Sequence, residues 1–125
     1  MLTKFGLLLR HLRLSKNQVL KDMADKIGVS SSYLSSVENG KRKVPRDWAD
    51  KIKSQYDLDK TQYLELLNAV DLTNKEIIIS LDCKSQEQKE VILSFARKVD
   101  DMDENFIKAF KELLKKQKGK TNNIR

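Results

Sequence analysis

The chain has 125 residues, of which 39% are hydrophobic and 34% charged, with one proline and four glycines. This composition suits one small helix-rich domain with an appendage and excludes several large domains. The single cysteine, Cys83, excludes an internal disulfide, and we expect it to pack in the protein interior. The first apolar run ends at Arg10, so we expect no signal peptide, no membrane span and a cytoplasmic location.

The net charge of +7 is distributed unevenly along the sequence. Residues 1–70 hold 13 Lys or Arg against 8 Asp or Glu, residues 71–114 hold 7 against 10, and residues 115–125 hold 5 against none. A basic surface on a small domain is typical of proteins that bind a polyanion, most often nucleic acid. A charge excess that only keeps the protein in solution is an equally open interpretation at this point.

Five short helices are predicted in the first half of the chain. Apolar residues recur at helical spacing over residues 3–14, 19–27, 30–38, 45–56 and 59–70. Thr3, Ser30 and either Asp59 or Thr61 are the expected N-caps, and Asn17 and Gly28 are suited to the left-handed conformation that ends a helix. Pro45 is expected in the first turn of the fourth helix. The expected buried residues of the last three helices are Leu34, Val37, Trp48, Ile52, Tyr56, Tyr63, Leu64, Leu67 and Val70.

The second and third helices form a helix-turn-helix candidate, in which the third would enter the DNA major groove. Four serines of the third helix face away from its apolar side, and we expect all of them to be exposed: Ser31, Ser32, Ser35 and Ser36. Small hydroxyls can bond to base edges, although serines also cap and solvate short helices. Four cations follow directly, where a loop would run beside phosphates: Lys41, Arg42, Lys43 and Arg46. The combination favours a DNA-reading surface.

A family resemblance rests on five short matches within residues 5–70. Leu12-Arg13, Met23-Ala24, Gly28-Val29-Ser30, Leu34-Ser35 and Glu38-Asn39-Gly40 resemble, in order and without gaps, the phage-repressor-like (Xre/Cro type) helix-turn-helix domain. The resemblance implies a DNA-binding transcriptional regulator of a low-GC Gram-positive bacterium or of its prophage or mobile element. It implies base reading by Ser31, Ser32 and Ser36, and contacts to bases or backbone by Tyr33, Lys41 and Arg42.

The same resemblance implies a structural ion pair between Arg13 and Glu38, which would join the first and third helices. Many members of the family have a phosphate-binding glutamine where this chain has Leu20. Gln18 or Lys21 could take its place. The full set of expected DNA-binding residues is Ser31, Ser32, Tyr33, Ser35, Ser36, Lys41, Arg42 and Lys43.

A strand and two amphipathic helices are predicted after residue 72. The segment EIIISLD at residues 76–82 is β-branched and alternating, which predicts a strand whose evident partner is the same segment of another copy. A capping box of Ser85 and Gln88 opens the first helix, and Asp103 caps the second, which would close near Gly119. The expected inner residues are Val91, Ile92, Phe95, Val99, Phe106, Ile107, Phe110, Leu113 and Leu114. We expect dimer contacts at Ile77, Ile79, Leu81, Phe95, Phe106 and Phe110.

No catalytic or metal site is indicated. Asp101, Asp103, Asn105 and Glu112 fit positions 1, 3, 5 and 12 of a calcium loop, but Phe106 stands where that loop needs glycine. The single histidine, His11, lies far in sequence from Cys83, and no phosphate loop or dinucleotide motif occurs. We therefore expect neither an enzyme nor a cofactor or metal.

The expected fold is mainly α, with a five-helix lambda-repressor-like DNA-binding domain over residues 1–72. A strand and two helices over residues 73–118 would dimerise the chain or bind a partner, and residues 119–125 would form a disordered basic tail. The favoured function is a homodimeric repressor that reads a near-palindromic operator in double-stranded DNA. The alternatives are an antitoxin-like autoregulator that holds a toxin or protease, and an architectural nucleic-acid binder without sequence preference.

Overall fold

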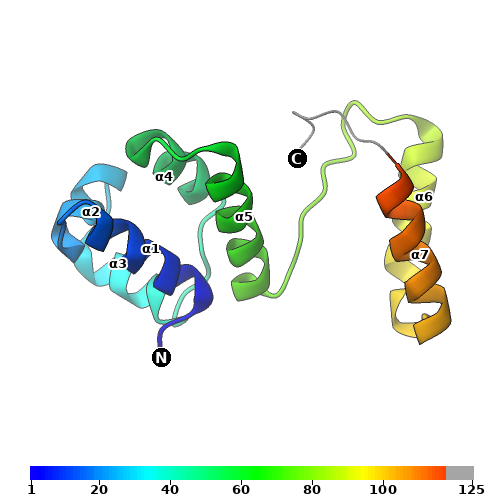
Figure 1. Ribbon diagram of the computed structural model, residues 1–125, viewed down its shortest axis with the longest axis horizontal. Coiled ribbons are helices and arrows are strands. Elements are labelled where there is room, and N and C mark those ends of the chain that lie inside the picture. Colours follow the sequence, from blue (N-terminus) through cyan, green and yellow to red (C-terminus); the bar gives the residue numbers. More distant parts are fainter. Residues whose placement is uncertain (118–125) are drawn as a thin grey trace. The chain divides into compact units, whose positions relative to one another are not determined.

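Figure 1 shows the computed structural model of the protein, which describes residues 1–117. This part of the chain contains seven α-helices and one short 3-10 helix. They are α1 (Lys4–Ser15), α2 (Leu20–Ile27), α3 (Ser31–Glu38), α4 (Trp48–Tyr56), α5 (Lys60–Asn74), α6 (Gln86–Lys98), η1 (Val99–Asp101) and α7 (Glu104–Lys116). The chain divides into two units, a first unit Met1–Ile77 and a second unit that begins at Ile78.

The first unit has one apolar core, to which all of its helices contribute. Phe5, Met23, Leu34, Ile52 and Leu66 come from five different helices, and none is more than 2% exposed. Helix α3 packs against α1 and α2, while α4 and α5 complete the enclosure (Figure 1). The core therefore holds α3 in place mainly through its packing against α1 and α2.

The predicted ends of the first helices are confirmed. The side chains of Thr3, Ser30 and Asp59 accept hydrogen bonds from the backbone N–H groups at the starts of α1, α3 and α5. Asn17 and Gly28 adopt left-handed backbone conformations, with φ of 55° and 78°, after α1 and α2. Local polar chemistry thus fixes where these helices begin and end.

Two details of α4 and α5 differ from expectation. Helix α4 begins at Trp48, so Pro45 precedes the helix instead of lying in its first turn. Helix α5 packs on both α1 and α4, and this turns its buried side toward Leu66, Leu67 and Ala69, leaving Leu64 exposed. The expected buried residues of α4 are confirmed.

The predicted β-strand is not formed, so that part of the fold prediction is wrong. Residues 76–81 connect α5 to α6 without regular structure, and Ile77, Ile78 and Ile79 are exposed. β-branched residues favour an extended backbone, but a strand exists only where a second strand completes its hydrogen bonds. No segment within residues 1–117 does so, and the described chain is entirely helical in its regular structure.

The second unit contains α6, η1 and α7. The Ser85–Gln88 capping box and the Asp103 cap are confirmed, with the Asp103 carboxylate 2.8 Å from the Phe106 amide nitrogen. The two helices meet where the rings of Phe95 and Phe110 lie 5.2 Å apart. No residue of α6, η1 or α7 is buried.

Three further expectations concern the rest of the chain. Cys83 is exposed, so the prediction that it packs in the interior is wrong, because the segment that carries it lies outside any core. The predicted helix end at Gly119 and the predicted tail 119–125 fall outside the described residues. No helix within residues 1–117 is both long enough and apolar enough to cross a membrane.

Candidate nucleic-acid interface

The turn between α2 and α3 positions the candidate reading helix. Gly28 supplies the positive φ that ends α2, and the Val29 amide donates to the Ala24 carbonyl at 3.0 Å. The Ser30 hydroxyl then accepts from the Tyr33 amide at 3.1 Å and starts α3. The short connection fixes the angle between the helices, because each of its residues either ends or begins one of them.

The outward side of α3 carries the serines, but they are not equally exposed. Residues of an α-helix are spaced about 100° apart, so Ser32 and Ser36 lie opposite the buried Leu34 and Val37. Ser32 is exposed, whereas Ser31, Ser35 and Ser36 are half-buried. The expectation that all four are exposed is therefore wrong for three of them, and Ser32 lies furthest from the core.

A buried ion pair joins α3 to α1. The Arg13 guanidinium forms two contacts with the Glu38 carboxylate, Nη1–Oε2 at 2.5 Å and Nη2–Oε1 at 3.1 Å. Arg13 is 7% and Glu38 3% exposed, and Arg13 also donates to the sulfur of Met23 in α2 at 3.4 Å. Loss of either partner would leave the other charge without compensation in a region that excludes water.

A second contact between α1 and α3 lies at the end of α3 and was not anticipated from the sequence. The Thr3 amide and hydroxyl both donate to the Glu38 carbonyl at 2.9 Å. A Cβ placed on Gly6 would lie 2.4 Å from the same oxygen, which is too close for any other side chain. A glycine inside the predicted first helix was the available sign of this close approach.

Aromatic stacking holds the loop after α3 against α3 and α4. The Arg42 guanidinium lies 5.2 Å from the centre of the Tyr33 ring, and that ring lies 5.6 Å from the Trp48 ring of α4. A guanidinium stacked on an aromatic face loses little of its capacity to bond phosphate at its edge. Tyr33 is thus placed between the core and a cation of the loop.

Asn74, at the end of α5, fixes the same loop from the other side and was not anticipated either. Its side-chain nitrogen donates to the Val44 carbonyl at 3.0 Å, and its oxygen accepts from the Val44 amide at 2.9 Å. The neighbouring Lys43 forms an exposed ion pair with Glu76, Nζ–Oε1 3.1 Å. Asn74 lies just after the five helices predicted from apolar spacing, so no periodic signal marked it.

The cations of the loop therefore differ in their surroundings. Lys41 and Arg42 are exposed, and no carboxylate among the described residues forms an ion pair with them. Lys43 is exposed but shares its charge with Glu76. Arg46, the fourth cation expected here, is likewise exposed and forms no ion pair with a carboxylate among the described residues. Lys41 and Arg42 are the unpaired cations nearest in sequence to the end of α3.

The start of α2 differs from the glutamine pattern that the resemblance implies. Gln18 accepts a hydrogen bond from the Tyr56 hydroxyl at 2.5 Å, which leaves its amide nitrogen as the donor it can offer outward. Burial raises the pKa of Tyr56, and the nearby Arg13 charge partly opposes this rise. Lys21 forms an exposed ion pair with Asp25 at 3.3 Å. The buried Tyr56 thus orients the Gln18 side chain, whereas Lys21 contacts only an exposed carboxylate.

The residues expected at a dimer interface divide into two groups. Phe95, Phe106 and Phe110 lie together where α6 meets α7. Ile77 and Ile79 are exposed, and Leu81 half-buried, in the connecting segment that forms no strand. Among residues 1–117, no group of His, Cys, Asp or Glu is arranged to hold a metal ion.

Comparison with known proteins agrees with this geometry. The helix-turn-helix domain family matches residues 4–66, about half of the chain, and the match spans α1 to α4 and the first part of α5. No curated protein and no solved structure shows significant similarity to the chain. The turn, the outward serines and the matched residues lead to one conclusion: the chain belongs to the helix-turn-helix domain family of DNA-binding regulators.

Proposed function

We propose that the protein is a homodimeric, sequence-specific repressor of transcription that inserts α3 into the major groove of double-stranded DNA. Two copies would place their α3 helices about 34 Å apart on a near-palindromic operator. The proposal assigns the chain to the phage-repressor-like (Xre/Cro type) branch of its family, in a low-GC Gram-positive bacterium or its prophage or mobile element. The protein would act in the cytoplasm by binding DNA, without catalysing a reaction.

The observation that carries the proposal is a rigidly held α3 whose outward side is polar and bordered by unpaired cations. Ser32 and Ser36 face away from the core, while Lys41 and Arg42 follow in a loop that is stacked and hydrogen-bonded in place. A serine contact is weaker than a bidentate arginine–guanine contact, which is worth about 1–3 kcal/mol. Phosphate contacts and bivalent binding therefore supply much of the affinity.

The proposal is tested by selecting bound fragments from a random DNA pool. We expect a consensus with two-fold symmetry and half-sites one helical turn apart. Ser32→Ala and Ser36→Ala should each change that consensus, whereas Ser54→Ala, at an exposed position of α4, should not. A pool without enrichment, or equal affinity for every duplex, would overturn sequence-specific reading and support an architectural role.

The phosphate contribution is measured separately from sequence reading. Replacing Lys41 and Arg42 together by alanine should weaken binding to all duplexes and reduce the slope of log affinity against log salt by about two. The matched control replaces Lys60 and Lys108, which are exposed on α5 and α7. An unchanged slope would place the loop away from the DNA backbone.

A second candidate is an antitoxin-like autoregulator, which the exposed apolar faces of α6 and α7 also support. In this case the second unit would hold a toxin or protease, and DNA binding would regulate the protein's own gene. Purification of the chain by itself distinguishes the two functions. A stable dimer favours the repressor, and a monomer that gains helix content only with a partner favours the antitoxin.

A further inference from the structure

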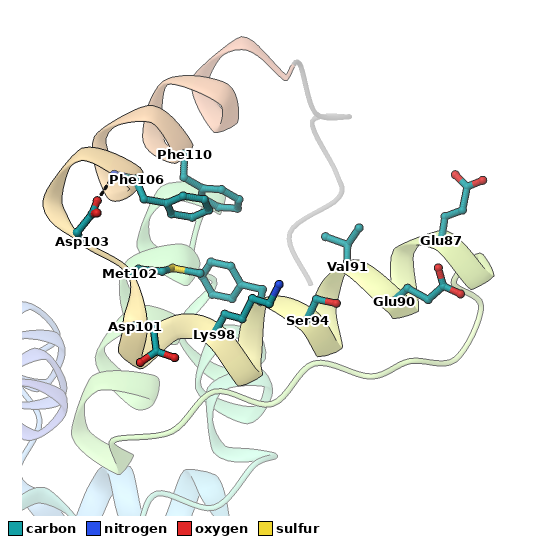
Figure 2. Close-up of a pocket in the computed structure, with 11 residues that line it drawn as sticks. Glu87, Glu90, Val91, Ser94, Lys98, Asp101, Met102, Asp103, Phe106 and Phe110 are labelled. Atoms are coloured by element: carbon teal, nitrogen blue, oxygen red, sulfur yellow. Dashed lines mark hydrogen bonds between the residues drawn. The ribbon is translucent and has the colours of Figure 1, made fainter.

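Helices α6 and α7 enclose an apolar groove of about 800 Å³. Figure 2 shows the rings of Phe106 and Phe110 and the side chain of Met102 turned into the space between the helices, with Val91 on the opposite wall. Phe95 completes the lining through its contact with Phe110. Val91, Phe95 and Phe106 are exposed, and Met102 and Phe110 are half-buried, within residues 1–117.

The two helices lack the burial that ordinarily holds helices in place. Each has 13 residues, a length at which an isolated helix is marginal in water. Val91, Phe95 and Phe106 remain 63%, 38% and 49% exposed. The pair of helices α6 and α7 would therefore be stabilised by any molecule that covers the groove.

The charges around the groove restrict what can cover it. Glu87, Glu90, Asp101 and Asp103 line it, against the single cation Lys98 (Figure 2). A ligand that fits should combine apolar side chains with positive charge, because the acidic rim would repel an anionic segment.

The last turns of α7 have that combination and do not use the groove of their own copy. Leu113 and Leu114 are 63% and 60% exposed. Lys111, Lys115 and Lys116 flank them, and although Glu112 forms an exposed ion pair with Lys115 at 3.5 Å, the segment keeps a positive excess. Phe106 and Phe110, earlier in the same helix, already form one wall of the groove. A continuous helix cannot fold back onto its own wall, so this end can enter only the groove of another molecule.

We propose that the groove between α6 and α7 receives residues 111–116 of a second copy, and that the exchange is reciprocal about a two-fold axis. Such an axis repeats each contact, so both acidic rims meet basic helix ends and both grooves are filled. A stable interface buries roughly 800 Å² on each partner, so the contact should extend beyond the groove to other exposed apolar side chains of α6 and α7, such as Leu93 and Ile107. The inference deepens the proposed function and rests on it for the homodimer.

The contact is tested by reciprocal charge reversal in the full chain, with association measured by sedimentation equilibrium in the absence of DNA. One variant carries Glu87→Lys and Glu90→Lys, and the other carries Lys115→Glu and Lys116→Glu. Each variant alone places like charges at both contacts of its homodimer, and its dissociation constant should rise at least about tenfold. An equimolar mixture restores opposite charges at both contacts, so it should associate as the unchanged chain does.

The mixture decides the question, because each reversal also opposes the dipole of its own helix and can weaken that helix. Glu65→Lys on α5 is the control for charge reversal elsewhere and should leave association unchanged. Failure of the mixture to associate, or an unchanged chain that is monomeric at all concentrations, would overturn the proposal. A foreign partner would then be the occupant of the groove.

DNA binding is followed separately, by the anisotropy of a labelled duplex. The first unit is unaltered in both variants, so weak binding to any duplex should persist when dimerisation fails. Loss of dimerisation with retained DNA binding rejects only the groove contact. Loss of all DNA binding by the unchanged chain would reject the proposed function itself.

Discussion

In the first unit, the apolar sides of α1 to α5 face one another and enclose side chains such as Leu34 and Ile52 completely. In the second unit, α6 and α7 carry apolar sides that are just as regular, yet none of their residues is buried. Five short helices can surround a core. Two helices packed only on each other leave part of each apolar face exposed to solvent. Amphipathic spacing therefore predicts a helix and its apolar face. It does not predict whether residues of the same chain bury that face.

Hydrogen exchange on dilution would test this comparison most directly. We expect the amides of the buried turns of α1, α3 and α5 to exchange at least about a thousandfold more slowly than those of α6 and α7, as a domain stable by about 5 kcal/mol or more requires. The proposed homodimer would cover α6 and α7, so the difference in exchange rate should be largest in dilute protein and should narrow as the protein concentration rises. Equal protection of both units in the monomer would show that the second unit is stable by itself.

Arg13→Ala should have the next largest effect and should be confined to the first unit. The substitution leaves the Glu38 carboxylate buried without its partner, at a cost of about 3–5 kcal/mol of unfolding free energy. Urea denaturation followed by circular dichroism measures the change. Lys21→Ala, which breaks the exposed pair with Asp25, is the matched control and should cost less than about 0.5 kcal/mol. A similar cost for both changes would contradict the structural role of the buried pair.

Asn74→Ala should loosen the loop after α3 while the core remains intact. It removes two hydrogen bonds to the Val44 backbone, each worth about 0.5–1.5 kcal/mol net. We expect faster exchange of the Val44 amide and weaker binding to all duplexes. Asn68→Ala, at an exposed site on the same helix, should change neither. Unaltered exchange at Val44 would mean that stacking of Arg42 on Tyr33 holds the loop without Asn74.

Glu76→Gln should have the smallest effect, at the point where the first unit leads into the connecting segment. Without the Glu76 charge, Lys43 becomes available to a phosphate. We expect affinity for any duplex to rise and the salt slope to steepen by up to about one. Glu65→Gln serves as the control. A slope that does not change would show that Lys43 lies too far from the DNA backbone to contribute.

The sequence was informative wherever structure depends on neighbouring residues. The caps at Thr3, Ser30, Ser85 and Asp103 were predictable because each is a polar side chain three residues before the amide that it accepts from. The matched family region and its turn at Gly28 followed from the same local patterns. These features require no knowledge of what packs against the helix.

Features that depend on distant residues were missed or misjudged. The contact of Asn74 with Val44 joins residues 30 apart and has no periodic signal. The isoleucines at 77–79 have the composition of a strand, but composition cannot reveal that a second strand is missing. Ser31, Ser35 and Ser36 are half-buried, and the Asn39 side-chain nitrogen lies 2.9 Å from the Ser35 carbonyl and 3.4 Å from its hydroxyl.

The ring contacts of Tyr33 give the protein a natural optical reporter. Trp48 is the only tryptophan in the chain, it is buried, and its indole lies beside the tyrosine on which Arg42 stacks. Any phosphate that draws Arg42 away from Tyr33 changes the surroundings of that one emitter. The intensity and wavelength of Trp48 fluorescence can therefore report, in real time, whether a phosphate is bound at the loop after α3. No dye needs to be attached to the protein or to the nucleic acid.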